Sequence, residues 1–364
     1  MRFVVNNRFN LEFEIAQGGF CSVYLGTDLE NGGREVALKL CHFKDKDGIK
    51  FPIDEASVLA DINGNKGIPT ISWSGHECEY YVIAQELLGP TLYALLEQCR
   101  VFSFKTTLLI ADQAIERLEF IHSKGYLHGD IKPANMAMGQ GEHGNLLYFL
   151  DFGLARKFGH DEEWKSRHGG ILFYTYLYAS PNVIDGKGCV FSPPLKLTRP
   201  TLTSHTEWSW ADDLESLGYV LLEICGGKTS WIINRKHNDP CYNDPCYNCR
   251  VLQLPRRCKQ QRPSVQKMCE GLPKEFFEYF QHIRSLEHGQ KPDYGHLREL
   301  FRCAFRNHGY QDDNIYDWTS KWFNEVHGIK STPKKQSELV EKQITTSLTP
   351  HELASAGGSI EMQL

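Results

Sequence analysis

The strongest constraint on how this chain of 364 residues folds is a pair of polar motifs in its middle. The first motif is His-Gly-Asp-Ile-Lys-Pro-Ala-Asn, residues 128–135, and the second is Asp-Phe-Gly, residues 151–153. Asp151 follows Asp130 by 21 positions, directly after the apolar run 146–150. Such a run predicts a buried strand that carries Asp151 to the same cleft as the first motif.

Together these residues supply what phosphoryl transfer requires. We expect Asp130 to orient the attacking hydroxyl and Lys132 to offset charge on the transferred group. Asn135 and Asp151 offer the oxygen ligands that Mg²⁺ prefers. Each residue alone is equally typical of a turn or a charged surface, so the prediction depends on the joint pattern.

A lysine at the end of an apolar strand extends this pattern toward the N-terminus. The stretch Val36–Lys39 reads Val-Ala-Leu-Lys, and a lysine there either reaches solvent along its stem or binds phosphate. In the second case a carboxylate from the following helix must hold the ammonium group. We predict Glu55 for this role, with Asp54 as the competing residue.

The segment Ile15–Val23 precedes this strand and is rich in small residues. Small residues let backbone N–H groups approach phosphate oxygens, although a glycine pair is more often only a turn. Of the Gly-x-Gly-x-x-Gly pattern only Gly18 is kept, because Ala16 and Cys21 occupy the outer positions. Its place just before the lysine strand favours a phosphate-covering loop.

The pattern of the whole chain predicts a bilobal α+β fold. Short β-rich stretches at residues 22–26 and 35–40 flank a hairpin signal at residues 31–33. Helical periodicity starts after Ser103, an expected N-cap, and recurs in three later stretches. These stretches cover residues 214–224, which end at Gly226 and Gly227, then 273–286 and 293–305. The cleft is expected where the lobes join, near residues 86–90.

Several longer stretches resemble the casein kinase 1 family of serine/threonine protein kinases. The resemblance runs from about residue 10 to residue 318, and the most specific stretches are Gly67–Ile71, Glu86–Leu92, Asp212–Leu221, Lys291–Tyr294 and Leu297–Arg302. It implies a kinase domain over residues 9–318, with a small lobe to about 87 and a larger lobe from about 88. Residues 319–364 are expected to form a flexible tail.

The resemblance also implies ATP with Mg²⁺, and serine or threonine hydroxyls of proteins as acceptors. Glu86 and Leu88 would bind adenine through backbone groups, and Ile15, Val23 and Ala37 would lie above the ring. Gly18, Lys39 and Glu55 would complete the nucleotide site, and Asp213 would anchor the loop that carries Asp130.

Two positions depart from the family pattern. Gly129 replaces the arginine that usually precedes the catalytic aspartate, so activation through a phosphate paired to that arginine is not expected. The His-Gly-Asp form is shared with the related vaccinia-related kinases. Leu177 stands where family members carry an arginine that binds a phosphate or an acidic group, so a preference for primed or acidic substrates is not assumed.

Composition limits the remaining choices. The net charge of −5 gives no global attraction to nucleic acid or to an anionic membrane. No stretch has the length of a membrane helix, and residues 1–5 are too short an apolar run for a secretory signal. The twelve cysteines are therefore expected to be reduced thiols. We expect a monomer located in the cytoplasm, the nucleus or both.

Two other functions fit parts of the pattern. Small-molecule phosphotransferases share a His-Gly-Asp opening with an asparagine five residues past the aspartate, but Lys132 and the long family-like stretches favour protein substrates. A pseudokinase scaffold would explain the eroded glycine loop and Gly129. However, such a chain is expected to lose at least one of the six catalytic-type residues, which are Lys39, Glu55, Asp130, Lys132, Asn135 and Asp151.

Overall fold

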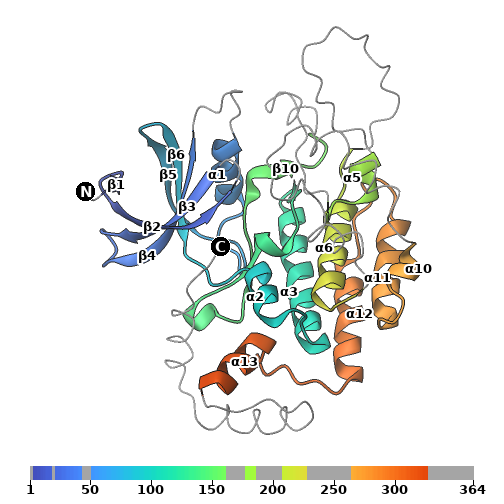
Figure 1. Cartoon of the computed structure of the whole chain (residues 1–364). Helices are drawn as coiled ribbons and strands as arrows, with labels where there is room; N and C mark the ends of the chain where they lie inside the picture. The colour runs from blue at the N-terminus through green and yellow to red at the C-terminus, as the bar shows by residue number, and fades with distance from the viewer. Residues whose placement is uncertain are drawn as a thin grey trace, which may run out of the picture.

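The computed structural model describes residues 3–18, 21–42, 51–160, 177–185, 207–227 and 264–326. These residues form a small lobe dominated by one β-sheet and a larger lobe dominated by helices (Figure 1). The expected bilobal α+β fold is therefore confirmed. Most of the 186–212 stretch and all of the 238–258 loop lie outside the described residues.

The small lobe is a six-stranded antiparallel sheet with one helix against it. Its strand order is β1-β2-β3-β4-β6-β5. The strands are β1 (Phe3–Val5), β2 (Phe9–Gln17), β3 (Cys21–Asp28), β4 (Arg34–His42), β5 (Ile71–Glu77) and β6 (Tyr80–Glu86), and the helix is α1 (Phe51–Asp61). One face buries Val5, Phe9, Val36, Leu38, Leu40, Val82 and Ala84. The predicted stretches 22–26 and 35–40 lie within β3 and β4.

A disulfide within this sheet corrects one prediction. Cys21 and Cys41 lie directly opposite each other in the β3–β4 ladder, with Cα atoms 4.2 Å apart, and their sulfurs are bonded. The expectation of reduced thiols is wrong for this pair. The cause is the hairpin register, because side chains of directly opposed residues project to the same side of the sheet. The described free cysteines are Cys78, Cys99, Cys225, Cys269 and Cys303.

The large lobe contains helices and short strand pairs around the main hydrophobic core. The helices are α2 (Leu92–Cys99), α3 (Phe104–Ser123), α5 (Pro181–Asp185), α6 (Trp210–Ile224), α10 (Val265–Met268), α11 (Lys274–Ser285), α12 (Tyr294–Asn307) and α13 (Asp317–Val326). The strands are β7 (Tyr126–Leu127), β8 (Met136–Met138), β9 (Leu147–Phe149) and β10 (Arg156–Lys157). β7 pairs with β10, and β8 pairs with β9.

Two predicted helix boundaries agree with the structure. The Ser103 hydroxyl accepts a hydrogen bond from the backbone N–H of Thr106 at 3.2 Å, as an N-cap residue should. α6 ends at Ile224, and Gly226 follows with φ +76°, a conformation that favours glycine.

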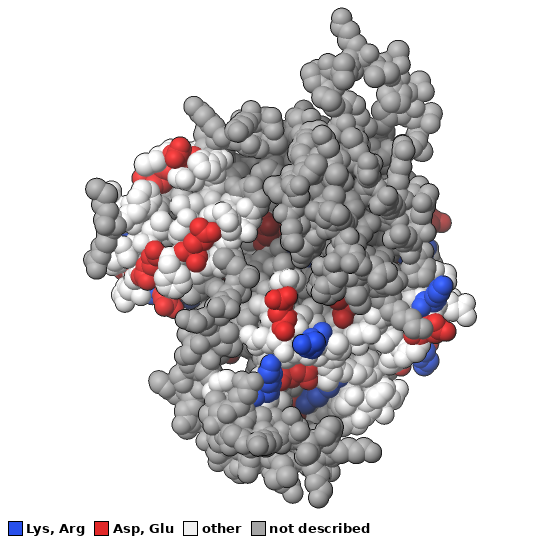
Figure 2. All heavy atoms as spheres, viewed as in Figure 1, with Lys and Arg blue, Asp and Glu red and all other residues white. Residues whose placement is uncertain are grey.

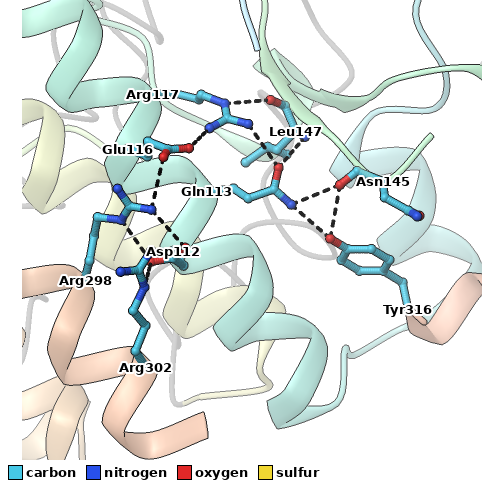
Figure 3. A network of polar contacts seen from close by, with 9 residues as sticks. All are labelled: Asp112, Gln113, Glu116, Arg117, Asn145, Leu147, Arg298, Arg302 and Tyr316. Atoms are coloured by element: carbon cyan, nitrogen blue, oxygen red, sulfur yellow. Dashed lines mark hydrogen bonds and ion pairs between the residues drawn. The ribbon is translucent and has the colours of Figure 1, made fainter. Parts of the chain in front are cut away.

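Polar contacts fasten α12 and the segment after it to α3 (Figure 3). Asp112 of α3 lies 2.9 Å from Arg298 Nε and 2.7 Å from Arg302 Nε, both on α12. Gln113 Nε2 donates to the Tyr316 hydroxyl at 2.9 Å. Tyr316 is buried, so the segment after α12 is anchored in the core of the large lobe at this residue.

The structure differs from the predicted tail at its start. Helix α13 runs to Val326, and its Lys321 ammonium donates to the backbone carbonyl of Gln98 at the end of α2, 2.9 Å away. Trp318 packs edge-on against Phe102 with ring centroids 5.3 Å apart. Aromatic packing and a hydrogen bond to the end of α2 therefore attach this helix to the large lobe. Residues 327–364 lie outside the described part.

The described surface is mixed in charge. Figure 2 shows acidic side chains spread over the small lobe and both signs intermixed over the large lobe on the face in view. No helix among the described residues is long and apolar enough to cross a membrane.

Candidate active site

Lys39 lies at the centre of the candidate site, on β4. Its ammonium group donates to Glu55 Oε2 of α1 at 2.6 Å and to Asp151 Oδ1 at 2.8 Å. Glu55 is 3% exposed and Asp151 46%, so one carboxylate is internal and the other faces the opening. The structure thus places Lys39 against Glu55, the carboxylate favoured over Asp54.

Burial and charge act in opposition on these groups. Desolvation opposes the charge on Lys39, but the carboxylates of Asp151 and Glu55 raise its pKa above the ordinary value. Desolvation raises the pKa of Glu55, and Lys39 offsets only part of that rise. Desolvation would also raise the pKa of Asp151, but the neighbouring Lys39 charge lowers it to about 2. Lys39 and Asp151 are therefore both charged near neutral pH.

Asp151 reaches this position from β9, the strand predicted within residues 146–150. The residue has φ +60°, a left-handed conformation, and the short 3₁₀ turn Phe152–Leu154 follows it. Non-glycine residues adopt this conformation rarely, and they do so more often at functional sites. The turn aims the carboxylate at Lys39 rather than along the strand.

The 128–135 loop gathers its three polar side chains around one carboxylate. Lys132 Nζ lies 2.6 Å from Asp130 Oδ2, and Asn135 Nδ2 donates to the same oxygen at 2.9 Å. Asn135 Nδ2 also donates to the Asp130 carbonyl at 2.9 Å. These bonds use the amide nitrogen of Asn135 and leave its oxygen as an acceptor. The oxygens of Asn135 and Asp151 are hard donors of the kind that suits Mg²⁺.

His128 joins this loop to the segment that carries Asp151. Its Nδ1 accepts from the Asp130 backbone N–H at 3.3 Å, so Nε2 carries the proton and donates to the Leu150 carbonyl at 3.1 Å. Desolvation lowers the pKa of His128. The Leu150 N–H also donates to the Asn135 carbonyl at 2.8 Å. A neutral buried imidazole thus fixes Asp130 relative to Asp151.

Asp213, near the start of α6, is hydrogen-bonded to the backbone of the same loop. Its carboxylate accepts from the backbone N–H of His128 at 2.7 Å and of Gly129 at 2.9 Å. His122 Nε2 lies 2.9 Å from the same carboxylate, and His122 Nδ1 lies 2.6 Å from the Tyr294 hydroxyl. Since a carboxylate only accepts, His122 Nε2 donates to Asp213. Burial opposes ionisation of Asp213, but the hydrogen bond from His122 lowers its pKa.

Sequence reasoning found Asp213 but missed His122 and Tyr294. The Tyr294 stretch was identified only as family-like, and His122 lies in the last turn of α3. Nothing in their sequence spacing brings the two together. The contact arises from the packing of α12 on α3.

Residues of the small lobe form one wall of the candidate site. In the β3–β4 register Val23 lies opposite Lys39, and Ala37 is two residues from Lys39, so all three project from one face of the sheet. Ile15 is half-buried near the end of β2. The Gly18 N–H donates to the Cys21 carbonyl at 2.8 Å, which closes the described ends of the glycine-containing turn. Residues 19 and 20 lie outside the described part.

Glu86 and Leu88 lie where the two lobes connect. Glu86 is the last residue of β6, opposite Val36 of β4. The Leu88 carbonyl accepts from Gln140 Nε2 at 3.0 Å, and the next residue, Gly89, donates its N–H to the Met138 carbonyl at 2.8 Å. The connection is thus attached to the β8 region of the large lobe.

The stretch around Leu177 is described only in part. Residues 173–176 lie outside the described part, whereas Leu177 is half-buried and packs against the main core. Farther along, the Ser180 hydroxyl donates to the Asp212 carboxylate, and Asn182 Nδ2 lies 3.0 Å from it. Leu177 therefore makes an apolar contact with the core at this point.

The site combines one buried cation, an exposed ionised carboxylate, and a second carboxylate with its own lysine and amide. This arrangement suits a triphosphate with a divalent cation beside an acceptor hydroxyl. Comparison with known families agrees: the family model described as "Protein kinase domain" matches residues 9–272.

Proposed function

Since the chain belongs to the protein kinase family, we propose that it transfers the γ-phosphate of ATP to serine or threonine hydroxyls of proteins, as casein kinase 1 enzymes do. The observation that carries this proposal is the double contact of Lys39, which touches Glu55 at 2.6 Å and Asp151 at 2.8 Å. This contact supports a site already arranged for nucleotide, because the lysine and the metal-binding carboxylate are in place together.

At the nucleotide end, Lys39 would contact the α- and β-phosphates while Glu55 keeps its ammonium from turning away. Adenine would lie under Ile15, Val23 and Ala37, and would hydrogen-bond to backbone groups of Glu86 and Leu88. Gly18 would let the backbone of the covering turn approach phosphate. A Cβ at this position would also crowd the Cys21 carbonyl oxygen, 3.2 Å away.

At the acceptor end, Asp130 would hydrogen-bond to the incoming hydroxyl and orient it toward the γ-phosphate. Lys132 contacts the same carboxylate, so its ammonium would lie close to the negative charge that develops during transfer. Asn135 and Asp151 would hold Mg²⁺, which neutralises phosphate charge when bound. The low pKa of Asp151 supports this role. Its carboxylate is already ionised near neutral pH, so no proton has to leave before a cation binds.

The alternative of a pseudokinase scaffold predicts nucleotide binding without turnover. The full set of six polar residues favours catalysis, because Glu55 and Asp151 both contact Lys39, and Lys132 and Asn135 both contact Asp130. A small-molecule phosphotransferase has no comparable support beyond the His-Gly-Asp motif. We further propose a monomer acting in the cytoplasm or nucleus.

A radiolabel assay separates these functions. Purified protein with Mg²⁺, γ-labelled ATP and casein should transfer label to protein, and acid hydrolysis should recover it as phosphoserine and phosphothreonine. Asp151→Ala should abolish transfer while circular dichroism stays unchanged. Nucleotide binding with no transfer would support the scaffold, transfer only to a small alcohol would support the phosphotransferase, and recovery as phosphotyrosine would contradict the acceptor class.

A further inference from the structure

We propose that Trp208 is a positioning residue that holds the 128–135 loop in its active geometry, in place of the side chain that Gly129 lacks. The inference rests on the proposed kinase function, since it assigns a role around Asp130. It concerns how the catalytic carboxylate is held rather than what it does.

The first observation is the crowded position of Gly129. Its φ is +77°, and a Cβ built there would lie 2.9 Å from the Leu154 carbonyl oxygen and 3.2 Å from Cζ3 of the Trp208 indole. The space that a side chain at position 129 would enter is thus occupied by Trp208. No L-residue fits there without displacing the indole and straining the backbone.

The second observation is that Trp208 belongs to a rigid part of the fold. It is 6% exposed and directly precedes Ser209, the N-cap of α6, whose backbone N–H donates to the Asp212 carboxylate at 2.7 Å. The next residue of α6, Asp213, binds the backbone N–H groups of His128 and Gly129. The start of α6 therefore contacts the 128–135 loop at two points, through the carboxylate of Asp213 and through the indole of Trp208.

The third observation links the loop to the segment after Asp151. The Arg156 guanidinium lies over the Trp208 ring, 3.7 Å from the ring centroid, and Arg156 is 2% exposed. In the β7–β10 ladder Arg156 pairs with Leu127, immediately before the 128–135 loop. A buried cation over an aromatic face is a favourable contact. Trp208 thus lies between Arg156 and Gly129.

The packing around this contact is tight. A cavity of only about 10 Å³ remains between the loop and the 177–185 segment, lined in part by Asp130, Tyr178 and Trp208. This volume holds about one water molecule at most. Loss of the indole would leave Gly129 without this packing contact. Glycine has the widest choice of backbone conformations, so the loop would then be free to move at this residue.

These contacts explain how a chain without an arginine at position 129 can keep Asp130 in place. The contact here is made by an indole that directly precedes α6 and stacks on Arg156. Asp130 is then held by groups that are present as soon as the chain has folded.

The test compares Trp208→Ala with Trp208→Phe and with Trp318→Ala as a matched control. Trp318, on α13, packs edge-on against Phe102 with ring centroids 5.3 Å apart and stacks on Tyr316. Trp208→Ala should lower kcat by roughly 10- to 100-fold while KM for ATP changes less than about threefold, because a small misplacement of a catalytic group is costly. Trp208→Phe keeps an aromatic face and should recover most of kcat, and Trp318→Ala should keep kcat within about threefold.

Hydrogen exchange provides a readout that does not need activity. Amides of residues 128–135 should exchange faster in Trp208→Ala than in the parent protein or in Trp318→Ala. Should Trp208→Ala not fold, Trp208→Leu replaces it in both measurements. Unchanged kcat and unchanged exchange in the 128–135 loop would overturn the inference, as would an equal fall of kcat in Trp318→Ala. An inactive parent protein would refute the proposed kinase function, and the exchange data would still decide the role of Trp208.

Discussion

The ammonium of Lys39 lies 2.8 Å from Asp151 Oδ1, although the two residues are 112 positions apart in the sequence. Lys39 comes from the sheet of the small lobe, and Asp151 follows a strand of the large lobe. The contact therefore joins the two lobes at the point where the triphosphate is proposed to bind. It also makes the charge state of each partner depend on the other.

Removal of Lys39 should separate activity from stability. Lys39→Met should lower kcat/KM by roughly 10²- to 10³-fold, because one preorganised donor to the phosphates is lost. Glu55 already has a raised pKa and can take up a proton once the ammonium is gone, which limits the structural cost. The free energy of unfolding should fall by only about 1 kcal/mol.

Lys105→Met is a suitable control, since Lys105 pairs with Asp313 at 2.6 Å in the large lobe. It should leave kcat/KM within about threefold of the parent value. Steady-state kinetics and urea unfolding of both variants provide the comparison. If Lys39→Met fails to fold, the lysine has a mainly structural role.

The Cys21–Cys41 disulfide should stabilise the small lobe. The bond closes a loop with a sequence separation of 20. Cys41→Ser should therefore lower the free energy of unfolding by about 3 kcal/mol under oxidising conditions, because the unfolded chain regains freedom. A reducing agent should lower the stability of the parent protein in the same way and leave Cys41→Ser unchanged.

The control for this experiment is Cys78→Ser, which alters an exposed free thiol. It should keep the parent's stability and its response to reductant. Peptide mapping without reductant should recover Cys21 linked to Cys41. Two free thiols in the native oxidised protein would show that the pair is not bonded.

The Arg8–Asp28 ion pair should make stability depend on pH in a defined way. Arg8 Nη2 lies 2.7 Å from Asp28 Oδ2, and hydrogen bonding to Arg8 lowers the pKa of Asp28 well below its usual range. A lowered pKa stabilises the fold above the ordinary aspartate value, and this stabilisation disappears as the pH falls toward the folded-state pKa. Asp28→Asn should thus cost about 2 kcal/mol at neutral pH.

This cost should stay constant down to about pH 5 and shrink below about pH 4, where the unfolded parent takes up a proton. Urea unfolding at several pH values measures the difference. Glu30→Gln, which alters the exposed second partner of Arg8, should cost less than about 0.5 kcal/mol at any pH. A difference between parent and Asp28→Asn that grows on acidification would have the wrong sign for this account.

Local signals in the sequence were enough to predict the elements that carry the site. The hairpin between β3 and β4, the Ser103 cap and the strand before Asp151 each depend on residues within a few positions of one another. The candidate site residues could be proposed from the sequence because their order and spacing are specific. Their geometry, such as the bond between Asn135 and Asp130, required the structure.

The residues that sequence reasoning missed are defined by contacts between distant elements. His122 meets Tyr294 only because α12 packs on α3, and Trp208 meets Gly129 only because α6 starts beside the 128–135 loop. The disulfide was missed for another reason. The expectation of reduced thiols does not take the hairpin into account, and the hairpin itself places Cys21 opposite Cys41.

The central claim is that Asp130 activates an acceptor hydroxyl beside a bound nucleotide. The most direct test measures Mg-ATP affinity and phosphate transfer to casein on the same Asp130→Asn protein. The account predicts an affinity within about threefold of the parent value and a transfer rate lower by at least about 100-fold. Transfer at the parent rate by Asp130→Asn would contradict it.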